Sequence, residues 1–173
     1  MPSRNGDLMR VAVAADHGGF ALKEYVATLL RQTGHEVVDF GALKLNPDDD
    51  FPDFVIPLAK AVAARKVERG IALCGSGIGA CIAANKVAGV RAGVIDNEFS
   101  AHQGVEDDNA NIMCLGGHVI GDSLAGELVR IFLAAHFTGV ERHRRRIAKV
   151  TALEAGHDFQ EWRQYVDHFS AGA

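Results

Sequence analysis

The stretch Arg69-Gly-Ile-Ala-Leu-Cys74-Gly-Ser-Gly-Ile-Gly79 carries the pattern on which the fold prediction depends. Residues 69–74 form a short, nearly continuous apolar run, as in a strand that is buried on both faces of a sheet. Three glycines then break the strand, and residues 80–86 return to a helical pattern. A buried strand that leads through a glycine turn into a helix is typical of α/β proteins with a parallel sheet.

The same unit recurs on both sides of this stretch. Further strands are predicted at residues 8–15, 36–40, 90–95 and 112–115. Helices are predicted after Gly19 and up to Thr33, at residues 54–65, from about 96 to 106, at 122–137 with Asp122 as the N-cap, at 139–155, and in a short piece around Trp162. Residues expected in the core include Val11, Val13, Leu73, Cys81, Ile82, Val94, Cys114 and Leu115. Five strands alternating with helices predict one parallel sheet covered on both faces, with its ligand site at the edge where the strands end.

Length and composition favour a single domain over residues 1–173, with residues 1–8 as a flexible leader and 156–173 as a C-terminal tail. A net charge of −4 and an aromatic content of 7% argue against nucleic-acid binding. Every apolar run falls far short of the ~20 residues that span a bilayer, so no membrane partner is expected. Three cysteines without a C-x-x-C spacing favour reduced thiols and a cytoplasmic location.

Cys74 stands at the mouth of the glycine turn. Backbone N–H groups of such a turn can point at an anion, and a thiol at the start of a helix is favoured as a thiolate, which can act as a base or a nucleophile. A tight turn after a buried, inert cysteine explains the same residues equally well. The spacing Gly75-x-Gly77-x-x-Ala80 is a weak dinucleotide fingerprint because it follows the third strand, and the lysine of a P-loop is missing.

Polar residues follow the first strand in the motif Asp16-His17-Gly18-Gly19. Asp16 can hold a hydroxyl group or fix a histidine tautomer, and His17 can bind a phosphate oxygen. The alternative interpretation is that Asp16 only caps the following helix. The segment 41–53 contains four aspartates and is expected to be an exposed loop.

Arg142 and Arg146 are spaced i, i+4 on the last predicted helix, so both guanidinium groups can grip one phosphate. A solvated basic face on an acidic protein is the alternative. Residues 106–111 form a polar segment before the fifth strand that could bind a cation or a sugar hydroxyl, or simply end a helix. The histidines show no metal-ligand spacing, so no metal is expected.

Taken in order, five segments resemble the ribose-5-phosphate isomerase B / galactose-6-phosphate isomerase family. They are Asp16-His-Gly-Gly-Phe20, Cys74-Gly-Ser-Gly-Ile-Gly79 with Ile82-Ala-Ala-Asn-Lys86, Ser100-Ala101, Asn111 with Leu115-Gly-Gly117, and Arg142-His with Arg146. The resemblance covers residues 9–147. It implies a Rossmann-like three-layer αβα sandwich with a five-stranded parallel sheet, and a homodimer or tetramer whose active sites are shared between subunits. It also implies an aldose–ketose isomerisation of a phosphosugar through an enediolate, without metal or cofactor.

The resemblance assigns a role to each matching position. Cys74 matches the thiolate base that moves a proton between C1 and C2, and Ser76 matches a hydroxyl that assists transfer at the oxygens. Asp16 matches a residue that orients the substrate. The enediolate would be stabilised by backbone amides of the turn: Gly75, Gly77, Ile78, Gly79 and Ala80. The phosphate would be bound by His17, Arg142 and Arg146.

Three positions depart from the family pattern. Asp107 stands where the family has the histidine that opens the sugar ring, Asp108 replaces the following asparagine, and His118 replaces a phosphate-binding arginine. Ribose 5-phosphate must be opened from its furanose form before C2 can lose a proton. A tetrose 4-phosphate cannot close a furanose ring because its O4 is esterified, so an isomerase acting on it needs no ring opener. Asp107 could also serve as the opener, or His102 could swing in to do so.

The sequence therefore predicts a sugar-phosphate isomerase with ribose 5-phosphate and ribulose 5-phosphate as the default pair, an enzyme of pentose phosphate metabolism. A tetrose/tetrulose 4-phosphate or another phosphosugar is the alternative within this class. A non-catalytic phosphosugar-binding protein is disfavoured because Cys74 is retained. A nucleotide-binding oxidoreductase remains as a third interpretation of the glycine turn.

Overall fold

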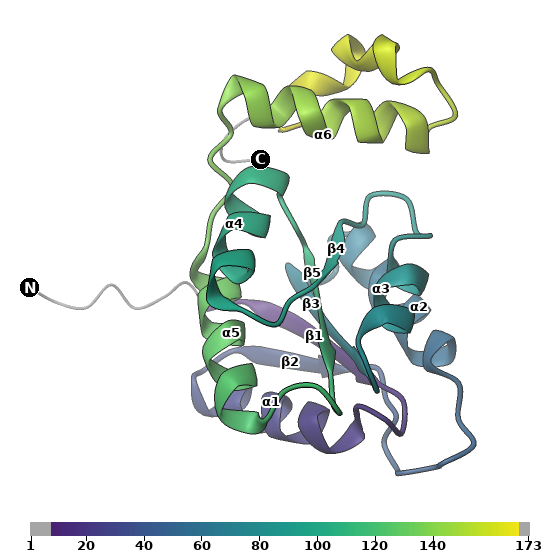
Figure 1. Ribbon diagram of the computed structural model, residues 1–173, viewed down its shortest axis with the longest axis vertical. Coiled ribbons are helices and arrows are strands. Elements are labelled where there is room, and N and C mark those ends of the chain that lie inside the picture. The colour runs from purple at the N-terminus through teal and green to yellow at the C-terminus, as the bar shows by residue number, and fades with distance from the viewer. Residues whose placement is uncertain (1–7, 170–173) are drawn as a thin grey trace, which may run out of the picture.

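The sheet holds five parallel strands in the order β2-β1-β3-β5-β4 (Figure 1). The computed structural model describes residues 8–169, so residues 1–7 of the predicted leader lie outside the described part. The strands are β1 (Arg10–Ala15), β2 (Glu36–Asp39), β3 (Arg69–Cys74), β4 (Ala92–Val94) and β5 (Ile112–Gly116). All five predicted strands are confirmed. β4 is shorter than predicted and lies at the edge of the sheet, where it pairs only with β5.

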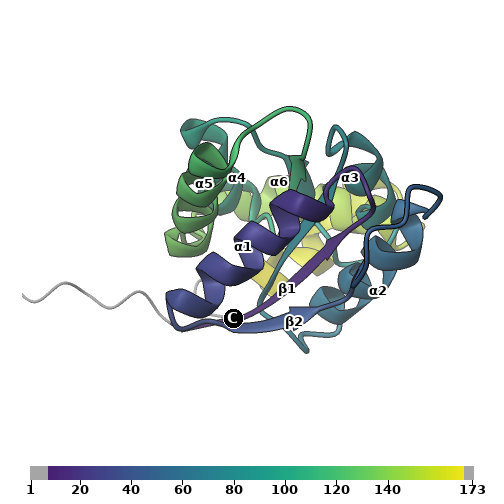
Figure 2. The same cartoon turned by 90° about the horizontal axis from the view of Figure 1, so that it is seen from below.

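Helices cover both faces of the sheet, as the sequence predicts. They are α1 (Phe20–Gln32), α2 (Phe51–Ala63), α3 (Ile78–Ala84), α4 (Glu98–Asp108), α5 (Asp122–Ala134), α6 (Glu141–Glu154) and a 3-10 helix η1 (Phe159–Phe169). Helices α1, α4 and α5 pack on one face, and α2 and α3 pack on the other (Figure 2). The Rossmann-like three-layer αβα sandwich is therefore confirmed.

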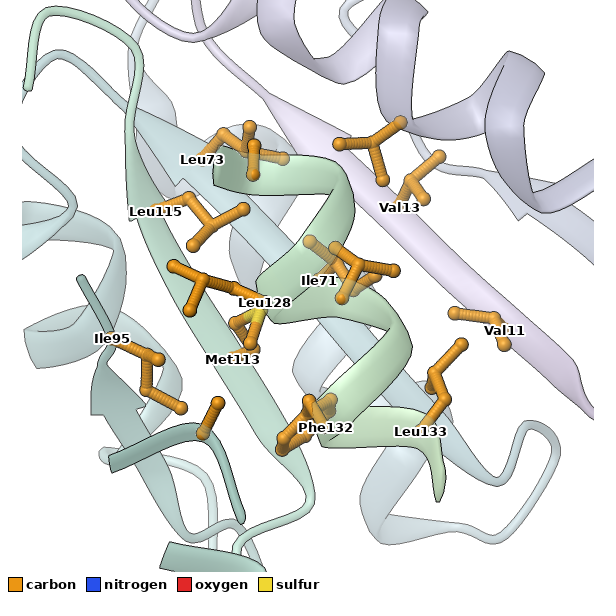
Figure 3. Packing of buried hydrophobic residues seen from close by; sticks show 14 of the residues in the cluster. Val11, Val13, Ile71, Leu73, Ile95, Met113, Leu115, Leu128, Phe132 and Leu133 are labelled. Carbon is orange, nitrogen blue, oxygen red and sulfur yellow. The ribbon is translucent and has the colours of Figure 1, made fainter. Parts of the chain in front are cut away.

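Successive side chains along each strand point to opposite faces of the sheet, so the core is divided into two layers. The larger side chains point toward α1, α4 and α5, among them Val11, Val13, Ile71, Leu73, Met113 and Leu115 (Figure 3). The opposite face of the same strands carries smaller residues, including Ala12, Ala14, Ala72 and Cys114, against α2 and α3. This pattern follows from the two-residue period of a strand that is covered on both sides.

Two predicted core residues are exposed. Ile82 on α3 is 58% exposed and Val94 on β4 is 37% exposed, so the prediction for both is wrong. Both belong to elements at the β4 edge of the sheet, where no further strand follows among the described residues. Periodicity shows which face of an element is apolar, but it does not show whether another layer of the same chain covers that face. Cys81, also predicted as core, is only partly buried.

Two local predictions also need correction. The N-cap of α5 is Gly121, and Asp122 is the first helical residue, where its carboxylate faces the positive end of the helix dipole. The segment 41–53 is not a fully exposed loop, because α2 already begins at Phe51 and the side chain of Asp49 is only 8% exposed.

Helix α6 and η1 pack on each other at the end of the sheet where the strands begin (Figure 1). Glu154 near the end of α6 accepts a hydrogen bond from the Gly89 N–H at 2.9 Å, and the Arg91 guanidinium lies over the ring of Phe169. Both Gly89 and Arg91 precede β4. The predicted helix around Trp162 is present as η1. Within residues 8–169, no helix is both long and apolar enough to cross a bilayer.

Candidate active site

Three turns meet at the edge of the sheet where β1, β3 and β5 end. The Gly117 N–H donates to the carbonyl oxygen of Cys74 at 2.8 Å, and the His118 N–H donates to that of Gly75 at 2.9 Å. Gly18 approaches the same place, since a Cβ added to it would lie 2.7 Å from the Gly75 nitrogen. Only glycine permits backbones to approach this closely. The sequence motifs after the three strands are therefore parts of one site.

The Cys74 thiol is held inside the glycine turn. Its Sγ accepts a hydrogen bond from the Gly77 N–H at 3.1 Å, and the residue is 5% exposed. The Ile78 N–H donates to Ser76 Oγ at 3.2 Å, which keeps that hydroxyl beside the turn. Helix α3 begins at Ile78, and the first N–H groups of a helix have no carbonyl partner within it. The Cys74 sulfur, the Ser76 hydroxyl and the N–H groups of Gly77 and Ile78 thus lie together in one turn.

Gly77 is required by this geometry. Its φ is +81°, and a Cβ there would lie 3.0 Å from the carbonyl carbon of Leu115 on β5. We expect Gly77→Ala to lower the free energy of unfolding by about 1–2 kcal/mol from the left-handed conformation alone, and to displace the amide that holds Cys74. Urea denaturation measures the first effect and steady-state activity the second.

Gly104→Ala is the matched control for that variant. Gly104 lies inside α4, and a Cβ there would meet the Cβ of Ala110 at an ordinary 3.9 Å. Alanine is expected to stabilise a helix interior by up to about 1 kcal/mol. Equal stability of the two alanine variants would contradict the role given to Gly77.

Asp16 and His17 lie at the end of β1. Asp16 is buried, and its Oδ1 accepts hydrogen bonds from the N–H groups of Gly18 at 2.9 Å and Gly19 at 3.2 Å. The carboxylate therefore shapes the turn and does not cap α1, whose N-cap is Gly19 without a side-chain bond. His17 is exposed, and its Nδ1 lies 2.7 Å from Asp49 Oδ1. This hydrogen bond raises the pKa of His17.

Asp16, His17 and Asp49 also form the one group in the described chain with metal-ligand geometry, since they offer one ligand atom each within 4.8 Å. His17 Nδ1 and one oxygen of each carboxylate are already engaged in the hydrogen bonds above. A cation held by these same atoms would displace the His17–Asp49 hydrogen bond.

Two residues near the turn, Phe51 and Asp49, were not predicted from the sequence. The ring of Phe51 covers Gly79, where an added Cβ would lie 2.9 Å from its Cζ. Asp49 belongs to the acidic segment that was expected to be solvated. The ring of His118 lies over Gly75, with its Cδ2 3.1 Å from the place of an added Cβ, so His118 belongs to this edge as predicted.

The remaining predicted residues lie at the opposite end of the sheet, where the strands begin. Helix α4 starts after β4 and runs back along the sheet, so Asp107 and Asp108, its last two residues, lie near the strand beginnings. Helix α6, which carries Arg142 and Arg146, crosses this end (Figure 1). One chain therefore presents two separate groups of candidate site residues.

His143 links the residues of this second group, and the sequence analysis missed it. The imidazole is buried; its Nδ1 lies 3.4 Å from Asp107 Oδ1 and 2.9 Å from Thr138 Oγ1. The Arg142 Nε–H donates to its Nε2 at 2.9 Å. A histidine between a carboxylate and a guanidinium fixes Asp107 and Arg142 relative to each other. The Arg142-His-Arg pattern was the available signal.

The fold and this site define a Rossmann-like α/β protein in which a buried thiol and three glycine-containing turns meet where β1, β3 and β5 end. A family described as Ribose/Galactose Isomerase matches residues 11–150. The chain belongs to this family.

Individual relatives agree with this assignment. Ribose-5-phosphate isomerase B of Mycobacterium tuberculosis is 40% identical over 87% of this chain and 93% of its own length. D-erythrulose-4-phosphate isomerase of Pectobacterium atrosepticum is 38% identical over 76% of this chain and 87% of its own length. The structure of ribose-5-phosphate isomerase B from Mycoplasma genitalium with bound ribulose 5-phosphate superimposes with a TM-score of 0.81, at 38% identity over 84% of this chain and 96% of that chain.

Proposed function

We propose that this chain interconverts ribose 5-phosphate and ribulose 5-phosphate by proton transfer. The observation that carries the proposal is the Cys74 sulfur, held by the Gly77 amide where three strand ends meet. The family relationship supports an aldose–ketose isomerase of a phosphorylated sugar, and the relative that binds ribulose 5-phosphate supports this substrate pair.

In the proposed reaction, the Cys74 thiolate removes the proton from C2 of the open-chain aldose. The electrons of that C–H bond form the C1–C2 double bond of an enediolate, and negative charge develops on the former carbonyl oxygen. Backbone amides of Gly75 and of the first turn of α3 stabilise this charge, while the Gly77 amide stays on the Cys74 sulfur and Ser76 exchanges protons at the oxygens. The thiol then returns its proton to C1, which gives the ketose and regenerates the thiolate.

A tetrulose 4-phosphate is the second candidate substrate. Asp107 stands where the resemblance places the ring-opening histidine, and a relative is a D-erythrulose-4-phosphate isomerase. In the structure Asp107 Oδ1 lies 3.4 Å from Nδ1 of the buried His143, whose Nε2 accepts a hydrogen bond from Arg142. We take the pentose as the substrate, because the Asp107 carboxylate is 26% exposed and can still transfer the protons that ring opening needs.

A substrate panel tests the choice directly. We expect purified protein to turn over ribose 5-phosphate with a kcat/KM at least about tenfold above that for erythrulose 4-phosphate, since an acid–base group remains at position 107. The measurement is initial rates by coupled or NMR assay. Dominant turnover of erythrulose 4-phosphate would replace the pentose with the tetrose, and turnover of neither would contradict an isomerase.

The complete site needs two subunits. Cys74 lies at the end of the sheet where the strands finish. The end where the strands begin carries Asp107, Asp108, Arg142 and Arg146. We therefore propose a homodimer, or a tetramer of such dimers, in which each subunit supplies the second group to its neighbour. Exposed apolar side chains on α3, β4, α4 and the turn after β5 support a contact surface beside the Cys74 edge: Ile78, Ile82, Val94, Phe99 and Val119. The reduced thiols favour the cytoplasm as its location.

A further inference from the structure

The acidic segment before α2 places one carboxylate against the turn that follows β1. Asp49 Oδ1 accepts two hydrogen bonds from His17, one from the backbone N–H at 2.9 Å and one from ring Nδ1 at 2.7 Å. Two bonds from one oxygen to backbone and ring determine both the position and the orientation of the imidazole. Asp48 and Asp50, on either side, are exposed.

Asp49 is the buried partner of this pair. The Asp49 side chain is 8% exposed, and its second oxygen, Oδ2, is buried without a hydrogen-bond donor among the described residues. A buried carboxylate needs a compensating positive charge. The imidazole that touches it is the nearest group able to supply one. The same hydrogen bond raises the pKa of His17, with smaller contributions from the negative charges of Asp16 and Asp49.

We propose that Asp49 is a positioning residue that keeps the His17 imidazole protonated and aimed at the phosphate group of the substrate. With Nδ1 bound to Asp49, the Nε2–H is the ring donor that remains for a ligand, and 41% of the His17 side chain is exposed. A protonated imidazole binds a phosphate oxygen through a charge-assisted hydrogen bond. This inference rests on the proposed function, because it requires that an anionic ligand binds beside His17.

The pH dependence follows from the direction of the shift. The imidazolium charge is complete below the pKa of His17 and disappears as the pH rises through it. Asp49 raises this pKa above 6.5, so the charge persists to higher pH. Asp16 on the adjacent turn acts in the same direction and remains in an Asp49 variant. Loss of the Asp49 charge should therefore weaken phosphate binding mainly on the alkaline side.

Asp49→Asn is the variant that tests this role, because it removes the charge and keeps the shape. Asp48→Asn is the matched control, with the same charge change at an exposed neighbouring position. The first readout is the titration of the His17 ring by NMR. We expect a lower pKa in Asp49→Asn and an unchanged one in Asp48→Asn. The titration needs no catalytic turnover.

The second readout is the Kd of inorganic phosphate from the same His17 resonances. At slightly alkaline pH we expect Asp49→Asn to weaken phosphate binding several-fold, and at about pH 6, below the ordinary imidazole pKa, the variant and wild type should converge. Asp48→Asn should follow wild type at both pH values. In turnover, Asp49→Asn should raise KM for the phosphosugar more than it lowers kcat.

Three outcomes would overturn the inference. These are an unchanged His17 pKa in Asp49→Asn, a lowered pKa without a change in phosphate affinity, and a wild-type His17 that titrates at or below the ordinary value. The last applies even if the variant does not fold. Failure of the proposed function would look different, because wild type would then turn over no phosphosugar while its His17 titration still reported on Asp49.

Discussion

Cys74→Ala is expected to lose at least about 10³-fold in kcat while it still binds the phosphosugar, because the proposed proton transfer has no other base in the glycine turn. The thiol is buried at the end of β3 and held by the Gly77 amide. Its removal shortens the side chain by one atom and leaves the amides and the turn in place. Initial rates give kcat, and calorimetric titration with the substrate gives the binding constant.

Cys81→Ala is the control for this experiment. The hydrogen bond from the Cys114 thiol lowers the pKa of Cys81 to about 7, so part of the Cys81 population is thiolate near neutral pH. It is partly exposed on α3 and faces the carbonyl oxygen of Ala92, away from the glycine turn. We expect its alanine variant to keep turnover close to wild type. Unchanged turnover in Cys74→Ala, or an equal loss in both variants, would refute Cys74 as the base.

A hybrid of two inactive subunits is expected to recover about half of the wild-type activity per dimer, since one of its two sites would be intact. One subunit carries Cys74→Ala, and the other carries Arg142→Ala with Arg146→Ala. In the proposed dimer both lesions fall in one site, because the thiol and the arginines lie at opposite edges of each chain. Co-expression with two different tags and tandem purification isolates the hybrid for assay.

A second hybrid tests whether the recovered activity comes from a site that is shared between the two subunits. Cys74 and His17 lie at the same edge, so a hybrid of Cys74→Ala with His17→Ala has one lesion in each site and should stay inactive. If the first hybrid also stays inactive, each subunit uses its own arginines and the shared site is wrong. A monomer in solution would contradict the dimer directly.

The strand-end motifs show how far sequence reasoning reaches for this protein. The apolar runs and glycine turns predicted all five strands, and the topology of a parallel sheet brings the turns after β1, β3 and β5 to one edge. Asp16, His17, Cys74 and His118 do lie there. The catalytic and binding roles given to these residues stay predictions until the variants are measured.

Contacts between distant segments escaped the same reasoning. Asp49 pairs with His17 across 32 positions, and its neighbours Asp48 and Asp50 have the same side chain but remain in solvent. His143 bridges Asp107 and Arg142 from inside a basic run that looked like a surface feature. Ile82 and Val94 have apolar side chains at core-like spacing, yet they are exposed because the sheet ends at β4.

Local pattern was enough for the αβα layering, the glycine turn around Cys74 and the family, because burial periodicity and backbone freedom are properties of neighbouring residues. The three-dimensional packing of the chain was needed to show that the candidate site residues form two groups at opposite edges and that one aspartate of three is turned inward against a histidine. These features depend on which surfaces come into contact when the segments pack. The burial of a residue by a distant segment, or its pairing with a distant charge, produces no periodic pattern in the sequence.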